Sequence, residues 1–154
     1  MSKNLTISLI LLIAIPIIVF FFYKKNPPQF ETINLKIKNI DYKLEVAKSI
    51  SQKSAGLSNR TKLCPNCGMI FIFTKDGIQP FWMKDTLIPL DMIWVNSSGQ
   101  ITDIITAKET NSTKIIQNTQ PAKYVIELNA LNSQEIGLKT GDTIDLSRLN
   151  EIEK

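Results

Sequence analysis

Histidine is absent from this chain of 154 residues, and cysteine occurs only twice. Without histidine the chain cannot build a Ser-His-Asp or Cys-His nucleophile, a histidine general base or a histidine-ligated metal site. Two cysteines supply half of the ligands of a structural zinc site, so zinc held by one chain is nearly excluded. We therefore expect no metal and no cofactor, and any chemistry has to use carboxylates, lysines, hydroxyls or the two cysteines.

Most of the chain also lacks an excess of positive charge. The formal net charge is +4, but Lys3, Lys24 and Lys25 lie in the first 28 residues, where there is no acidic residue. In the remainder, basic and acidic side chains nearly balance. A nucleic-acid-binding domain usually carries a strong positive charge or a basic patch. We therefore expect no nucleic acid among its partners.

One long uncharged run stands near the N-terminus, at residues 5–23. As a helix it would span about 28 Å, close to the hydrocarbon thickness of a bilayer. Lys24 and Lys25 follow it, where a membrane interface favours positive charge. A cleaved signal peptide is the alternative, but its apolar core would be shorter and would end at small residues, whereas this run ends in phenylalanines and a tyrosine. We therefore expect an uncleaved, single membrane span.

This run divides the chain into two parts. Residues 1–28 are expected to be an N-terminal membrane anchor and spacer, and residues 29–154 a single domain. Positive charge on both sides of the run leaves its orientation open. A short tail is most simply left inside, so we expect the domain on the outer side of the cytoplasmic membrane.

The second part is patterned as short strands. Apolar and polar residues alternate at residues 33–37 and again, with the opposite parity, at residues 40–46, which predicts two strands joined by a tight turn. A short helix is expected at residues 49–57. Further strands are expected at residues 69–73, 79–83, 92–96, 100–107, 123–129 and 143–146. Short strands with frequent turn residues and one small helix predict an all-β fold, either a compact sandwich or a barrel.

Cys64 and Cys67 form a C-x-x-C sequence, and three uses of it stay open. A structural disulfide or thiol pair is the simplest, since the domain is expected outside the cytoplasm. A thiol-disulfide exchanger would normally place the pair at the start of a helix, whereas here an apolar strand follows. Two free cysteines without a role are the third alternative.

Four motifs together resemble a known family. They are CGMIFIF at residues 67–73, FWMKDTLIPLDMIWV at residues 81–95, PAKYVIELNA at residues 121–130 and GLKTGDTI at residues 137–144. In this order they are similar to the family called domain of unknown function 192 (DUF192). The resemblance covers about residues 35–146 and implies a jelly-roll-like β-sandwich, often behind a signal or anchor segment, with no established activity. The chain departs from the family pattern at Asp85, where asparagine is common, at Leu131, where glycine is common, and in its cysteine pair.

The motif at residues 81–95 concentrates the candidate site residues. Trp82, Lys84 and Thr86 share one face of an extended segment, where an aromatic ring, an ammonium and a hydroxyl could bind a polar or anionic ligand. The full candidate set is Trp82, Lys84, Asp85, Thr86, Asp91 and Glu127.

Three alternatives exist for these residues. In the first, Lys84 forms a structural ion-pair network with Asp91 and Glu127, because charges in apolar surroundings are normally paired. In the second, the set binds a small ligand. In the third, Asp91 and Glu127 act as the paired carboxylates of a hydrolase.

The functional prediction follows from the anchor, the missing histidine and this polar and aromatic motif. We expect a membrane-anchored, extracytoplasmic and non-enzymatic module of the cell envelope that binds a small ligand or assembles with an envelope protein. The alternative is an enzyme, either a thiol-disulfide exchanger at Cys64 and Cys67 or a carboxylate-dependent hydrolase at Asp91 and Glu127.

Overall fold

The structure, a computed structural model, describes residues 28–152. The predicted membrane span at residues 5–23 lies outside these residues. Among the residues that are described, no helix has both the length and the apolar character needed to cross a bilayer. The predicted division between anchor and domain therefore stays a prediction.

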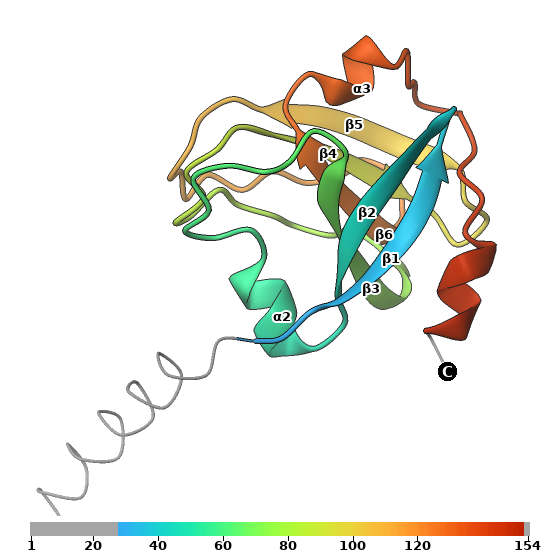
Figure 1. Cartoon of the computed structure of the whole chain (residues 1–154), viewed down its shortest axis with the longest axis horizontal. Helices are drawn as coiled ribbons and strands as arrows, with labels where there is room; N and C mark the ends of the chain where they lie inside the picture. Colours follow the sequence, from blue (N-terminus) through green and yellow to red (C-terminus); the bar gives the residue numbers. More distant parts are fainter. Residues whose placement is uncertain (1–27, 153–154) are drawn as a thin grey trace, which may run out of the picture.

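The described part of the chain is mainly β, as the sequence predicts. Its six strands are β1 (Glu31–Ile37), β2 (Ile40–Ala47), β3 (Cys67–Gly77), β4 (Leu90–Val95), β5 (Ile101–Ala107) and β6 (Ala122–Asn129). Its helical segments are short and are α2 (Ile50–Ala55), α3 (Asn132–Glu135) and the 3-10 helix η1 (Ser147–Glu151). Figure 1 shows α2 and α3 at opposite ends of the domain.

All six strands belong to one sheet, in the order β1-β2-β3-β6-β4-β5. β2 and β3 are parallel, and the other neighbours are antiparallel. Within residues 28–152 the edge strands β1 and β5 do not pair with each other, so the sheet is not closed. The predicted jelly-roll-like barrel is therefore wrong, and one open sheet replaces the two sheets of a sandwich. Alternating patterns identify strands and their faces, but they do not identify neighbours.

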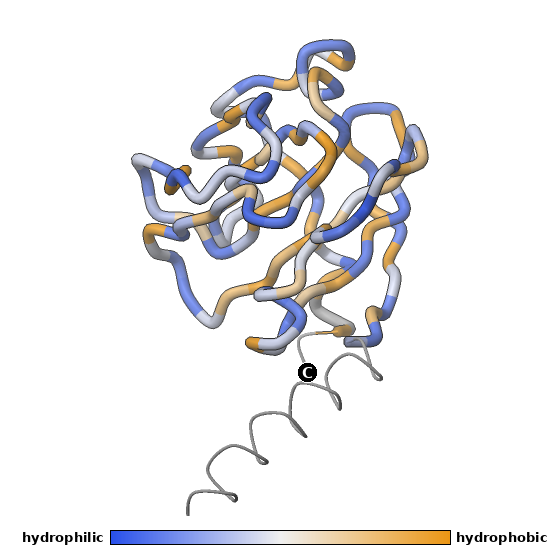
Figure 2. Tube along the Cα trace, turned by 90° about the vertical axis from the view of Figure 1, so that its left-hand side faces the viewer, coloured by the Kyte–Doolittle hydropathy of each residue, from blue (hydrophilic) through white to orange (hydrophobic). Residues whose placement is uncertain are grey.

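Apolar side chains cover both faces of this sheet. On β3, Ile70 and Ile72 belong to one core cluster, while Met69 and Phe71 belong to the other. The first cluster also contains side chains from both edge strands, so the sheet curves around it. Figure 2 shows hydrophobic and hydrophilic residues interspersed along the folded chain. The second cluster, opposite the first, lies against the candidate site.

Helix α2 confirms the helix that the sequence predicts at residues 49–57. Ser49 caps it, and Ser49 and Gln52 form a reciprocal capping box, which satisfies backbone donors at the helix start. None of its residues is buried. The Gln52 side chain also donates a hydrogen bond to the carbonyl of Gln29 at 2.7 Å, which fixes α2 beside the beginning of β1.

Two of the predicted strands are not strands in the structure, and each forms only one isolated β-bridge. Residues 79–83 contribute one bridge, from Phe81 to Ile116, and residues 143–146 contribute one, from Gln100 to Thr143. Pro80 has no N–H to donate to a neighbouring strand, so the first segment cannot continue as a ladder. As a consequence, the motif at residues 81–95 begins as a loop and becomes β4 only at Leu90.

Candidate ligand-binding groove

A groove of about 460 Å³ lies beside the second core cluster. Its walls come from α2, from β3, from the loop at residues 80–86 and from Ile115, and Glu127 of β6 contributes to it from the sheet. Trp82, Lys84, Thr86 and Glu127 of the predicted site line this groove. Asp85 and Asp91 do not belong to its lining.

Aromatic rings form much of the groove wall. Phe71 and Phe81 meet edge to face with ring centroids 4.9 Å apart, and Phe73 and Phe81 meet with centroids 6.4 Å apart. Behind them, Phe81 packs against the buried Trp94 at 6.0 Å. Such edge-to-face packing holds each ring in a defined orientation. The wall is therefore apolar and anchored to the core.

Glu127 is the most unusual residue of the groove. It lies on β6 opposite Met69 of β3 on one side and Met92 of β4 on the other, and only 5% of its surface is exposed. Burial raises the pKa of Glu127 from 4.5 to about 8, and no hydrogen bond or ion pair within residues 28–152 reaches its carboxyl. Buried polar groups nearly always have a partner. Near neutral pH this one is mostly a carboxylic acid, able to donate and accept a hydrogen bond.

The local packing at Glu127 depends on a glycine of the neighbouring strand. A Cβ atom at Gly68 would lie 2.3 Å from the carbonyl oxygen of Glu127 and 2.7 Å from a methyl carbon of Leu128. Only glycine permits β3 and β6 to approach this closely. The glycine of the CGMIFIF motif therefore fixes the position of the strand that carries the buried carboxyl.

Two lysines line the groove together with Glu127. The ammonium of Lys53 lies 4.4 Å from the ring centroid of Phe73, and that of Lys84 lies 5.9 Å from the ring centroid of Trp82. Burial lowers the pKa of Lys53. Within residues 28–152 the ion pairs are Lys38 with Asp142, Lys48 with Glu31 and Arg60 with Glu45. The predicted ion-pair network of Lys84 with Asp91 and Glu127 is therefore not formed.

The loop that carries Lys84 is a tight turn. Thr86 donates its N–H to the carbonyl of Met83 at 3.1 Å, and Asp85 has a φ of 57°. Aspartate and asparagine adopt this left-handed conformation more readily than most residues. Asp85 therefore fills a turn position, while Thr86 is buried against the groove.

Asp91 lies on the other face of the sheet from Glu127. On β4, Asp91 is two residues from Ile93 and therefore points to the same face, which is the face of the first core cluster. On β6, Glu127 is two residues from Val125 and therefore points to the face of the second cluster. The buried Asp91 carboxylate accepts hydrogen bonds from the Thr106 hydroxyl at 2.7 Å and from two backbone N–H groups. The structure therefore does not bring together the two carboxylates that the predicted hydrolase would need.

Cys64 and Cys67 form a disulfide, with their Cα atoms 5.1 Å apart. The pair closes a turn at the start of β3, where Cys67 donates its N–H to the carbonyl of Cys64. The Asn129 side chain donates a further hydrogen bond to that carbonyl at 3.0 Å. A strand, and not a helix, begins at this pair, unlike the arrangement expected of a thiol-disulfide exchanger.

Replacing both cysteines with serine should reduce the free energy of unfolding by about 2 kcal/mol, since a disulfide of this loop length restricts the unfolded chain by that amount. Urea unfolding of the variant, and of the reduced wild type, measures the loss. Any ligand that binds in the groove of the wild type should still bind to the variant. Loss of that binding would instead assign the pair a part in the function.

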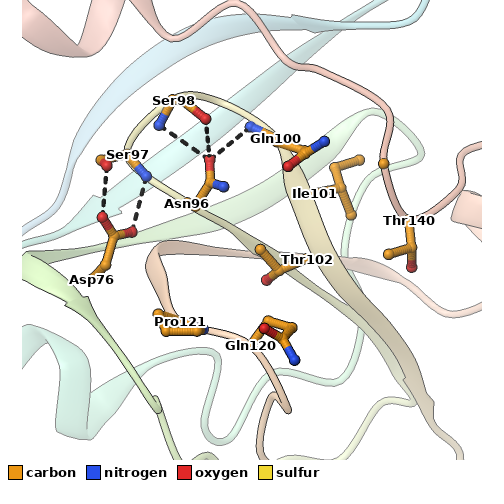
Figure 3. A pocket seen from close by; sticks show the side chains of 11 residues that line it. Asp76, Asn96, Ser97, Ser98, Gln100, Ile101, Thr102, Gln120, Pro121 and Thr140 are labelled. Atoms are coloured by element: carbon orange, nitrogen blue, oxygen red, sulfur yellow. Dashed lines mark hydrogen bonds between the residues drawn. The ribbon is translucent and has the colours of Figure 1, made fainter.

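A second hollow lies at the turn between β4 and β5 (Figure 3). Its polar groups bond one another. Asp76 accepts hydrogen bonds from the backbone and side chain of Ser97, and the Asn96 side chain accepts from Ser98 and from the Gln100 N–H. These bonds hold the turn itself. Among the described residues, no cluster of acidic or cysteine side chains could hold a metal ion.

The structure adds groove residues that the sequence did not identify. Lys53 comes from α2, and Ile115 from the long loop after β5. Phe71 and Phe73 were expected only as residues of a buried strand. The one available signal was the density of phenylalanine in the motifs at residues 67–73 and 81–95.

These features define a small, mainly β domain with an apolar groove on one face of an open sheet. The chain belongs to the DUF192 family, described as an uncharacterized ACR, whose family model matches residues 32–146. A search of curated proteins found no match.

Two solved structures are similar to this chain. A protein of Sinorhizobium meliloti, described as a candidate transcription regulator, is 33% identical with a TM-score of 0.69, and the match covers 76% of this chain and 93% of that one. A protein of unknown function from Novosphingobium aromaticivorans is 26% identical with a TM-score of 0.67, and the match covers 76% of this chain and 85% of that one.

Proposed function

We propose that this chain is a membrane-anchored, extracytoplasmic domain that binds a small ligand in the groove and catalyses no reaction. The observation that carries the proposal is Glu127, a mostly buried acidic residue that lines an open groove and whose carboxyl makes no hydrogen bond or ion pair within residues 28–152. An unpaired buried polar group is costly, and one that faces a binding groove gains a partner when a ligand arrives.

The chemistry of the groove indicates the kind of ligand. The phenylalanine wall favours an apolar or aromatic body, and Lys53 and Lys84 favour a negatively charged group. The neutral Glu127 can hydrogen-bond a carbonyl or hydroxyl oxygen of the ligand. A small amphiphilic anion satisfies all three.

The anchor and the location rest on the sequence. Residues 5–23 are long enough for one span, and Pro27 and Pro28 form a stiff spacer before the domain. A role in DNA binding, suggested by the description of the Sinorhizobium meliloti protein, is not adopted, because positive and negative side chains nearly balance in the domain.

Ligand binding can be tested by thermal melting of the full chain against aryl carboxylates, alkyl carboxylates and alkyl phosphates. A compound that binds the folded chain raises the melting temperature by mass action. We expect one class to do so, and we expect Lys84→Met to remove the shift while Lys36→Met, at an exposed position on β1, retains it. An equal shift in both variants would place the ligand outside the groove. No shift with any class would favour an assembly module.

A further inference from the structure

Exposed apolar side chains gather along the groove. Ile50 of α2 is 89% exposed, Ile115 is 53% exposed and Trp82 is 48% exposed, and all three line the groove. They come from three segments that are distant in sequence. Exposed apolar side chains that gather in one place mark a contact with another molecule, whereas scattered ones do not.

The charge of the same surface is positive. Lys53 and Lys84 line the groove beside these apolar side chains, and neither takes part in the ion pairs of residues 28–152. Glu127, the acidic residue of the lining, is mostly neutral near pH 7 because its pKa is about 8. A surface that combines exposed apolar and aromatic residues with lysines is typical of proteins that lie on anionic lipid.

A membrane span at residues 5–23 would hold the start of the domain near the lipid. Pro28 and Ile50 line one shallow hollow, and Figure 1 shows β1 beginning beside α2. The uncharged run ends at residue 23, and residues 24–28 can extend over at most about 17 Å. If residues 5–23 cross the bilayer, Pro28 is held within that distance of the lipid surface, and α2, which carries Ile50 and Lys53 of the groove, lies beside Pro28.

We propose that the groove opens onto the membrane surface and takes an anionic phospholipid from it. Ile50, Trp82 and Ile115 contact the interfacial region of the bilayer, where tryptophan is especially favoured. Lys53 and Lys84 contact the anionic headgroup, and the apolar part of the lipid lies against the phenylalanine wall. This inference rests on the proposed function and names its ligand class.

The two tryptophans of the chain make this inference measurable. Trp82 belongs to the groove surface, whereas Trp94 is buried behind Phe81 and donates its indole N–H to the carbonyl of Gln79. Bromine atoms on lipid acyl chains quench tryptophan emission at short range. The full chain is therefore reconstituted into vesicles made of equal parts phosphatidylglycerol and phosphatidylcholine, with bromine on only one of the two lipids.

We expect brominated phosphatidylglycerol to quench the emission more strongly than brominated phosphatidylcholine, and we expect Trp82→Phe to lose most of that quenching. The double variant Lys53→Gln and Lys84→Gln should remove the preference for phosphatidylglycerol. The matched double variant Lys36→Gln and Lys139→Gln, which removes the same charge outside the groove, should keep it.

Flotation of the same vesicles distinguishes a failure of this inference from a failure of the proposed function. Chain that floats without quenching of Trp82 contradicts docking of the groove while leaving the proposed anchor in place. Equal quenching by the two brominated lipids contradicts selection of an anionic lipid. Chain that does not float with the vesicles contradicts the membrane anchor of the proposed function itself.

Discussion

Replacing Glu127 with glutamine should abolish a loss of stability that the wild type suffers between pH 4.5 and about pH 8. The pKa of Glu127 is about 8 in the folded chain and 4.5 when burial is removed. Between these values the folded state holds the proton and the unfolded state does not, so unfolding becomes easier as the pH rises. At 1.36 kcal/mol for each pH unit, the whole change is about 5 kcal/mol.

Urea unfolding at a series of pH values measures this difference. Below pH 4.5 both states are protonated and the stability is highest, whereas above pH 8 both states are ionised and the loss is complete. Glutamine has no proton to lose, so the variant should lack this component. Glu109→Gln, at an exposed glutamate, is the control and should keep the pH dependence of the wild type. If the stability of the Glu127→Gln variant and that of the wild type change with pH in the same way, burial does not raise the pKa of Glu127.

A ligand in the groove should change this pH profile as well. If the ligand accepts a hydrogen bond from the protonated carboxyl, it binds more tightly below pH 8 than above it. The same residue that weakens the domain at high pH would therefore strengthen ligand binding at neutral pH. A residue that lowers stability but serves binding is common at binding sites.

Asp91→Ala should lower the free energy of unfolding by about 3–5 kcal/mol, since it removes a buried carboxylate and leaves its donors without a partner. Two of these donors are the backbone N–H groups of Leu131 and Ser133, at 3.0 and 2.7 Å from the carboxylate. The carboxylate thus fixes the segment in which α3 begins. Leu131 there has a φ of 69°, a conformation that glycine adopts more easily.

Urea unfolding gives the size of this effect, and hydrogen exchange locates it. Residues 131–138 should exchange faster in the variant, because the N-terminal side of α3 loses its anchor. Asp41→Ala, at an exposed aspartate on β2, should change stability little. Equal losses in the two variants would show that the Asp91 hydrogen bonds add nothing to stability. A ligand that raises the melting temperature of the wild type, as proposed, should also bind Asp91→Ala at temperatures where the variant is folded.

The sequence predicted the strands better than their arrangement. The change of parity after Ile37 identified the hairpin of β1 and β2, because alternation records directly which residues face the core. Nothing in the alternation indicates that β3 lies parallel to β2, or that β6 lies between β3 and β4. Helix α3 was missed because a buried carboxylate 40 residues before Leu131 supports its start, and no residue within the helix signals it.

The residues of the candidate site were predicted better than the structure of their segment. Trp82, Lys84 and Thr86 were assigned to one face because the segment was expected to be extended. Residues 83–86 instead form a tight turn, and it is this turn that brings all three to the groove. Glu127 and Asp91 were both recognised as acids in apolar surroundings, but their assignment to opposite faces depends on the register of β4 with β6. Lys53 reaches the groove only because α2 lies beside β3, and no pattern in the sequence around Lys53 indicates this contact.

The central position of β6 has a consequence for how the chain matures. Until residues 122–129 have been synthesised, β3 and β4 each expose a whole row of unpaired backbone groups, and the sheet exists only as two separate pieces, β1-β2-β3 and β4-β5. Open edges of apolar strands invite pairing with other chains. The unfinished sheet therefore needs protection from neighbouring chains until its last strand has been synthesised, and a truncation before residue 122 should produce aggregates rather than a smaller folded domain.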